Sequence, residues 1–178
     1  MIKTTKKNVE NLKPLVPVSE ALENLSFHNI KMGYTGLMYY RNLGLIPPPE
    51  KVSGYKERFY NINKLLDRIT AIRLTAALFE RNFQEIARLS KILPEDVFNK
   101  LPIAFMEKIA QWGSQSDKIS DILFFGRVIF WGGVREAAKT HQNKSFDEFY
   151  EEVNRRIQTK HPRFPSMLEK IWKKEKKG

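Results

Sequence analysis

Apolar residues recur at helical spacing over most of the chain. In the first part they predict a short helix that begins at Ser19, the expected N-cap, and a second helix over residues 34–43. Leu37, Tyr40 and Leu43 of the second helix share one stripe, which should therefore face a core. Gly44 follows directly, and because glycine readily adopts the left-handed conformation of a helix C-terminus, it is expected to end this helix.

The next segment combines a run of prolines, which prevents helix continuation, with a basic turn. Residues 47–49 are three consecutive prolines, which predict a stiff extended strut that cannot rejoin the helix. A hairpin-like turn around Gly54 follows, with lysine, arginine and tyrosine on both sides, a composition typical of a loop that lies along a phosphate backbone. Asn61 or Asn63 should then cap a long helix whose apolar residues recur over residues 65–79.

The second half of the chain is predicted to be helical as well. Pro94, with the two acidic residues after it, is a good helix start, and residues 103–112 form a separate helical segment. Apolar residues predict a further helix over residues 117–138, for which a pair of strands across residues 122–131 is the alternative.

Two capping boxes predict the last helices. Ser145 precedes Glu148 by three residues, and Ser166 precedes Glu169 by the same spacing, so each pair can satisfy free N–H groups of a first helical turn. The helix after Ser145 is predicted to be amphipathic. Its apolar face consists of Phe146, Phe149, Tyr150, Val153 and Ile157.

Composition and charge narrow the class of protein. The chain has 178 residues, of which 42% are hydrophobic and 29% charged, enough for one ordinary domain or two small modules. It has no cysteine, which excludes disulfides and thiolate metal sites, and no apolar run of the roughly 18 residues that span a membrane. A net charge of +11 and a pI near 9.8 favour a polyanionic partner, with nucleic acid ahead of membrane lipid or a merely solubilising surface.

Both ends of the chain are basic. Residues 1–14 are expected to form a flexible basic arm, and because no apolar core follows them, they do not indicate a signal peptide. The lysine-rich C-terminal tail is expected to be a solvated, frayed helix, with a contact to the DNA backbone as the alternative.

Little in the sequence supports catalysis. His28, His141 and His161 have no second histidine or cysteine at metal-ligand spacing, so no metal site and no cofactor are expected. The acidic residues within 148–152 lie on one helix face and indicate solvation, not a general acid and base. Aromatic residues are frequent in the second half, where a core and subunit interface is favoured over an effector pocket for an apolar or cationic small molecule. We therefore expect a protein that is not an enzyme.

One stretch resembles a known family. Residues 37–60, LMYYRNLGLIPPPEKVSGYKERFY, followed by LLDRITAIRL and FQEIARL, resemble the DNA-binding domain of MerR-type transcriptional regulators. The resemblance covers residues 15–90 and implies a winged helix-turn-helix there. The helical pattern of residues 91–178 predicts a small all-helical domain after it, so the expected fold is mainly α. Met38 stands where the family usually has arginine, and Arg41 where it usually has glutamate.

The resemblance also implies how such a protein works. A two-fold dimer lays the second helix of each subunit in the major groove and the wing on the flanking backbone, and it bends or untwists promoter DNA. Family members continue into a long dimerising helix, which Pro94 and Pro102 interrupt here. We therefore expect residues 91–178 to be a helical dimerisation or effector domain with a basic tail, and the apolar face after Ser145 to be the dimer interface.

Candidate DNA-binding residues come from the second helix, the basic turn and the long helix. Tyr34, Thr35 and Met38 are expected to contact the groove. Lys51 and Lys64 add charge, and Lys64 is expected to share the solvent side of the long helix with Arg68. The expected phosphate contacts are Tyr39, Arg41, Tyr55, Lys56, Arg58 and Arg68.

The predicted function is sequence-specific binding of double-stranded DNA by a homodimeric transcriptional regulator. Its expected location is cytoplasmic and nucleoid-associated, and RNA polymerase is a candidate partner. An architectural or mobile-element DNA-binding protein with the same fold, such as an excision or partition factor, is the first alternative. A helical scaffolding protein that binds no DNA is the second.

Overall fold

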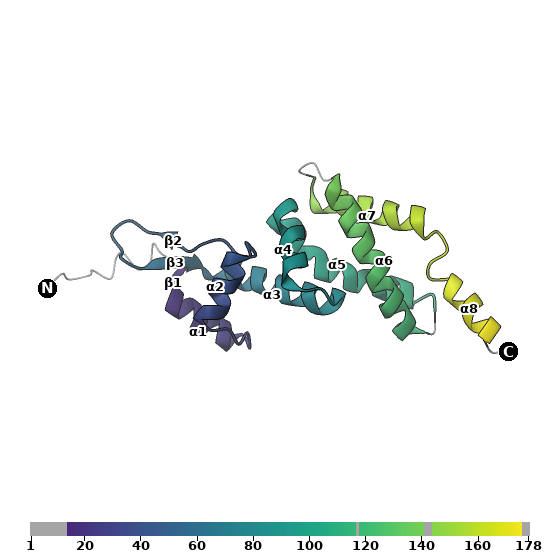
Figure 1. The fold of residues 1–178 in the computed structure, drawn as a ribbon, viewed down its shortest axis with the longest axis horizontal. Coiled ribbons are helices and arrows are strands. Elements are labelled where there is room, and N and C mark those ends of the chain that lie inside the picture. Colours follow the sequence, from purple (N-terminus) through teal and green to yellow (C-terminus); the bar gives the residue numbers. More distant parts are fainter. Residues whose placement is uncertain (1–13, 117, 141–143, 176–178) are drawn as a thin grey trace. The chain divides into compact units, whose positions relative to one another are not determined.

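The structure, a computed structural model, describes residues 14–116, 118–140 and 144–175. It is mainly helical with one small three-stranded sheet, as the predicted mainly α class requires (Figure 1). The chain divides into two compact units between Thr70 and Ala71, within helix α3 (Ile62–Phe79).

The first unit, up to Thr70, combines short helices with an antiparallel sheet. Its elements are β1 (Leu15–Pro17), α1 (Val18–Phe27), α2 (Tyr34–Asn42), β2 (Glu50–Lys51), β3 (Arg58–Asn61) and the start of α3. The strand order is β1-β3-β2, so β3 pairs on both sides, with Val16 opposite Tyr60 and Lys51 opposite Arg58. The predicted hairpin-like turn is confirmed, whereas β1 was not predicted.

The predicted second helix is confirmed as α2. Leu37 and Tyr40 are buried and Leu43, at the C-cap, is half-buried, so the predicted apolar stripe faces the core. Phe59 of β3 and Ile69 of α3 are buried in the same unit. Apolar burial therefore fixes which side of α2 remains in contact with solvent.

Gly44 ends α2 in the predicted conformation. Its φ of 76° lies in the left-handed region. The N–H of Gly44 donates to the carbonyl of Arg41, and the N–H of Leu45 donates to the carbonyl of Tyr40, both at 2.9 Å. These two bonds form the pattern of a Schellman cap and satisfy carbonyls that would otherwise lack partners.

The expected exposure of Arg68 is wrong. Its side chain is only 7% exposed, and its Nε donates to the carbonyl of Leu45 at 2.8 Å. Lys64, one turn earlier on α3, is exposed as predicted. Arg68 therefore acts as a structural link between α3 and the turn after α2, and it is no longer a candidate phosphate contact.

The starts of α1 and α3 differ in how well they follow the sequence. Asn61 caps α3 as predicted, because its Oδ1 accepts from the N–H of Lys64 at 3.2 Å. Ser19 is not the N-cap of α1; Pro17 occupies that position. Pro17 is also the last residue of β1, so the strand passes directly into the helix. The helix therefore begins earlier in the chain than predicted.

The second unit, from Ala71 onward, is built of helices. Its elements are the end of α3, α4 (Phe83–Ile92), α5 (Glu95–Gly113), α6 (Ile119–Lys139), α7 (Phe146–Lys160) and α8 (Met167–Glu175). α6 confirms the helix predicted over residues 117–138, so the alternative of two strands is wrong. α5 is one helix where two were expected, because Pro102 is buried inside it. A proline removes one backbone donor, and burial of its ring favours continuation of the helix on both sides.

Of the two predicted capping boxes, the first is confirmed. The Ser145 hydroxyl accepts from the N–H of Glu148 at 3.3 Å, and the Glu148 carboxylate accepts from the N–H of Ser145 at 2.8 Å. Ser166 makes a different contact, in which its hydroxyl donates to the carbonyl of Arg163 at 2.8 Å.

Aromatic side chains form the centre of the second unit. The ring centroid of Phe79 lies 4.7 Å from that of Phe105, 5.8 Å from that of Phe130 and 5.0 Å from that of Trp131. All four side chains are buried. This confirms that aromatic residues of the second half build a core, as large rings with offset contacts stabilise small helical domains.

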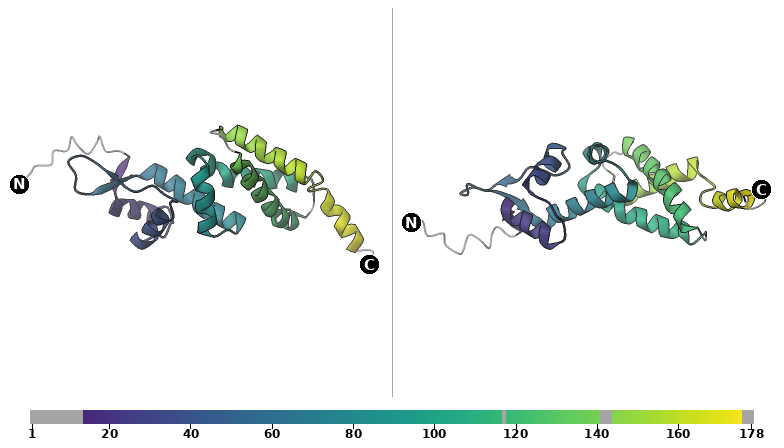
Figure 2. Two further views of the ribbon diagram at one scale, coloured as in Figure 1. Left: turned by 45° about the horizontal axis from the view of Figure 1, so that its top comes forward. Right: turned by 60° about the horizontal axis from the view of Figure 1, so that its bottom comes forward.

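α6 and α7 run side by side (Figures 1 and 2). Phe149, Val153 and Ile157 of α7 are buried, as the predicted amphipathic helix requires. The helices approach closely at Gly133, where a Cβ would lie 2.8 Å from Cγ1 of Ile157. Since this face of α7 packs within the chain, it is not available as the predicted dimer interface.

Arg127 ties α6 to the end of α3. Its Nε donates to the carbonyl of Leu78 at 2.6 Å, and its Nη1 lies 2.8 Å from Oε1 of Glu80. Glu80 follows α3 with φ of 50°, in the left-handed region. The guanidinium therefore satisfies a carbonyl at a helix C-terminus, where intrahelical donors are missing.

The division of the chain differs from the predicted boundary near residue 90. The end of α3 and all of α4 belong to the second unit. Phe79 is part of its aromatic core, and α4 contacts α6. Residues 1–13 of the predicted basic arm lie outside the described residues.

Gly44→Ala should lower the free energy of unfolding by about 1 kcal/mol, because a Cβ is strained in the left-handed region. Gly132→Ala is the matched control, since Gly132 is helical and a Cβ there would meet nothing within 4 Å. The control should instead gain roughly 0.5–1 kcal/mol from helix propensity. Urea unfolding followed by circular dichroism measures both, and changes of the same sign would contradict the left-handed helix stop.

Arg68→Met should lower the free energy of unfolding by about 1–3 kcal/mol, because the Leu45 carbonyl loses its donor while most of the side-chain volume stays. Lys64→Met, on the exposed side of the same helix, should change it by less than about 0.5 kcal/mol. The same urea titration applies. If Arg68→Met proves as mild as its control, the buried hydrogen bond is not a structural link.

Candidate nucleic-acid interface

The exposed side of α2 presents aromatic and polar side chains. Because Leu37 and Tyr40 face the core, Thr35, Met38 and Asn42 lie on the opposite side at helical spacing. The residues of this side that are exposed or half-buried are Tyr34, Thr35, Met38, Tyr39, Arg41 and Asn42. A row of side chains that end in hydrogen-bonding or apolar groups, all on one helix, is the type of surface that contacts base edges.

The N-terminus of α2 favours anions. Its N-cap is Gly33, which has extended backbone and no side chain to accept from the first N–H groups. The first turn contains no acidic residue, and the exposed Lys31 precedes it. Unsatisfied N–H groups and the positive end of the helix dipole together attract groups such as phosphate.

Arg41 lies in the last turn of α2 and interacts with β3. Burial raises the pKa of the Tyr60 phenol, and the nearby charge of Arg41 only partly offsets this rise. Tyr60 is therefore neutral at physiological pH, as burial disfavours the phenolate. Arg41 is half-buried in this position, where a cation also complements the negative end of the helix dipole.

The β2–β3 hairpin places cations directly opposite each other. Lys51 pairs in register with Arg58, and both side chains are exposed, as is Lys56. Tyr55 is half-buried because its ring lies edge-on against Phe59, with centroids 5.3 Å apart. Gly54 turns the chain with φ of 85°. Tyr55 thus anchors the turn, while the three cations face solvent.

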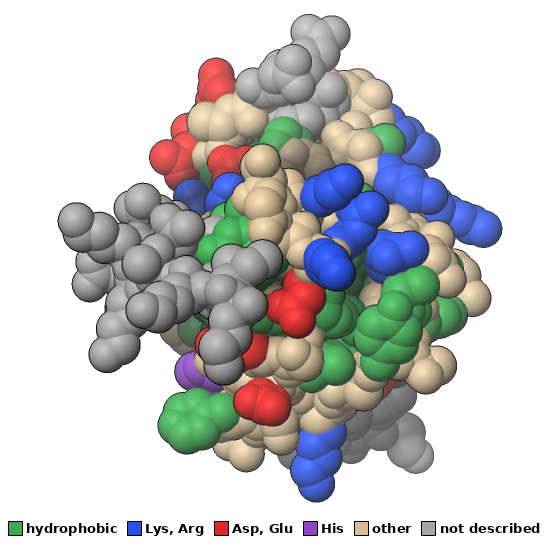
Figure 3. All heavy atoms as spheres, turned by 90° about the vertical axis from the view of Figure 1, so that its left-hand side faces the viewer, with side chains coloured by type: hydrophobic (Ala, Val, Ile, Leu, Met, Phe, Trp, Pro, Cys, Tyr) green, Lys and Arg blue, Asp and Glu red, His purple; other side chains and the backbone are tan. Residues whose placement is uncertain are grey.

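The structure brings most predicted site residues into two groups of the first unit. One group lies on α2 and the other on the hairpin, and Lys64 is exposed at the start of α3. Glu50 and Glu57 interleave with the hairpin cations. Figure 3 shows a face on which Lys and Arg side chains gather beside hydrophobic ones. Asn42 shares the exposed side of α2 but was not among the predicted contacts, although its position seven residues after Thr35 on one helix could have indicated it.

The described residues offer no metal-binding cluster. No group of three or more His, Cys, Asp or Glu side chains that could hold a metal ion occurs among them. His28 and His161 are exposed, and His141 lies outside the described residues. Over the same ranges, no helix is long and apolar enough to cross a lipid bilayer.

Comparison with known proteins adds no relative. A scan against models of known protein families, a search of curated proteins and a search of solved structures each found no match.

Proposed function

We propose that this protein binds double-stranded DNA through α2 and the β2–β3 hairpin of its first unit. The observation that carries the proposal is the pair Lys51 and Arg58, which lie opposite each other with both side chains exposed. Like charges opposite each other destabilise a pair of strands. A phosphate that contacts both cations would turn this repulsion into charge-assisted hydrogen bonding.

In this proposal α2 reads the DNA sequence. The major groove of B-DNA admits one α-helix, and the row formed by Thr35, Met38 and Asn42 on the exposed side of α2 carries no charged side chain. Thr35 and Asn42 supply hydrogen-bonding groups, and Met38 supplies an apolar contact for a thymine methyl group. Tyr34 and Arg41, seven residues apart on α2, border one side of this row and Tyr39 borders the other, where they are placed to contact phosphates.

The hairpin corresponds to the wing of a winged helix-turn-helix and lies on the flanking backbone. Lys51, Lys56 and Arg58 contact phosphates there, with Lys64 at the start of α3 as a further cation. Contacts of this kind orient a protein on the duplex and carry no sequence information. Their contribution depends on salt, because each phosphate contact releases condensed counterions.

Transcriptional regulation is the finer part of the proposal, and the resemblance of residues 15–90 to MerR-type regulators supports it. Mapping of bound sites across the genome tests it directly. Isolated sites in promoters are expected for a regulator. Sites clustered within one mobile element would favour an architectural or excision factor.

A second copy of the chain completes a two-fold DNA site. An exposed apolar stripe of the second unit lies on the first half of α6, where Phe124 is 61%, Phe125 44% and Val128 57% exposed. The rings of Phe124 and Phe125 touch edge-to-face with centroids 5.2 Å apart. Contiguous exposed apolar side chains are typical of an interface, so we place the dimer contact on this stripe instead of α7.

Lys56→Ala combined with Arg58→Ala should weaken binding to all DNA sequences similarly. The slope of log affinity against log salt should become shallower by about 1–2 units, because two phosphate contacts are lost. Lys91→Ala combined with Arg163→Ala removes the same charge from exposed positions of the second unit and should leave the slope unchanged. Fluorescence anisotropy with a labelled duplex at several salt concentrations measures it. An unchanged slope in the first double variant would refute the role of the hairpin.

Val128→Glu should convert a dimeric full-length chain into a monomer, because an unpaired charge would be buried at the centre of the α6 stripe. Ile103→Glu is the control, since Ile103 is 62% exposed on α5 and outside this stripe. Light scattering at matched concentration gives the mass of each variant. A wild-type chain that is monomeric even on its DNA would rule out the dimer.

A further inference from the structure

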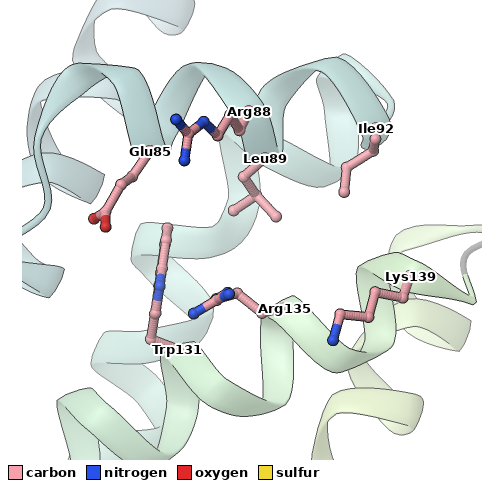
Figure 4. A pocket seen from close by; sticks show the side chains of 7 residues that line it. All are labelled: Glu85, Arg88, Leu89, Ile92, Trp131, Arg135 and Lys139. Carbon is pink, nitrogen blue, oxygen red and sulfur yellow. The ribbon is translucent and has the colours of Figure 1, made fainter.

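A hollow lies between α4 and α6, inside the second unit and apart from the proposed DNA contacts (Figure 4). Its volume is about 210 Å³. Apolar and cationic side chains from two helices border this one space. The lining residues are Glu85, Arg88, Leu89, Ile92, Trp131, Arg135 and Lys139.

The apolar wall of the hollow is held in place from behind. Trp131 is 4% exposed, and its ring packs on Phe79 in the core with centroids 5.0 Å apart. The guanidinium of Arg81 lies over the same indole, 5.6 Å from its centroid. Leu89 points from α4 toward α6 (Figure 4), and Ile92 extends the apolar surface to the rim. This wall is therefore preformed, as in most ligand sites.

The charges around the hollow do not cancel. Glu85 is the acidic residue of the lining, and its Oε2 lies 3.8 Å from Nη1 of Arg81 in an ion pair. Nζ of Lys139 lies 3.0 Å from Oε1 of Glu136 in a second ion pair. Neither Arg88 nor Arg135 forms an ion pair with a carboxylate within the described residues. Two guanidiniums without counter-charge therefore border an apolar wall on opposite helices.

We propose that this hollow binds a small organic carboxylate with an apolar body, such as an arylalkanoic or branched-chain acid. Guanidinium groups match a carboxylate in shape and charge, and the indole and leucine side chains match the apolar body. Inorganic phosphate would leave the apolar wall uncovered, and an amine would be repelled by both arginines. The proposal stands whether or not the first unit binds DNA.

Three probes separate the two parts of this recognition. 3-Phenylpropionate has both charge and apolar body, 3-phenylpropanamide has only the body, and acetate has only the charge. Each is titrated into the full chain while the indole N–H resonance of Trp131, assigned with a Trp131→Phe spectrum, is followed by NMR. We expect 3-phenylpropionate to bind with a Kd on the order of 1 mM, as is typical of ligands with about ten non-hydrogen atoms. The other two should bind at least about tenfold more weakly, since each lacks one of the two contacts.

Variants locate the site on the protein. Arg88→Gln combined with Arg135→Gln should weaken binding of 3-phenylpropionate by at least about tenfold. Arg163→Gln combined with Lys170→Gln removes the same net charge from exposed positions elsewhere and should keep the wild-type affinity. Ile92→Glu, which places a negative charge at the rim, should also weaken binding and serves if the double variant does not fold. Equal binding of the acid and its amide, equal losses in both double variants, or no shift of the Trp131 resonance at about 10 mM probe would each overturn the proposal.

Discussion

The first unit depends on one buried guanidinium. Arg68 of α3 donates to the carbonyl of Leu45, which lies in the turn that ends α2. Gly44 gives this turn its left-handed residue, but a buried carbonyl beyond it still needs a donor, and the chain supplies one from 23 residues away. This charged contact links the end of α2 to α3, in addition to the buried apolar side chains of both helices. It therefore helps to hold the exposed row on α2 in position.

A similar contact recurs in the second unit. Arg127 of α6 donates to the carbonyl of Leu78 near the end of α3, so an arginine again satisfies a carbonyl where helical donors run out. A planar guanidinium with several fixed donors suits this task better than an ammonium group. The net charge of +11 therefore overstates the cations that are free to bind a polyanion.

Features that depend on interactions between adjacent residues were predicted from the sequence. Features that depend on contacts between residues far apart in the chain were not. The stop at Gly44 and the capping box at Ser145 each depend on a few adjacent residues, and both were found. The burial of Arg68 depends on a carbonyl far away in the chain, so helical spacing alone placed it on the solvent side. Continuation of α5 through Pro102 depends in the same way on tertiary burial, which overrides a local helix breaker. Of the candidate site, the groups on α2 and the hairpin could be predicted, whereas the hollow beside Trp131 could not, because it needs two helices to meet.

The cations that remain uncompensated show what the fold leaves for its partners. Exposed like charges cost little at a distance, since the screening length is about 8 Å at physiological salt. The Cα atoms of Lys51 and Arg58 are partners on paired strands, a spacing shorter than this length at which like charges repel each other. Arg88 and Arg135 likewise border one hollow, and neither forms an ion pair with a carboxylate of the described residues. A neutral partner would leave either repulsion in place, whereas an anion that contacts both members of a pair removes it. If the two proposed sites bind as argued, relief of a cost already present in the free protein contributes to their affinity and favours anionic partners over neutral ones of the same shape.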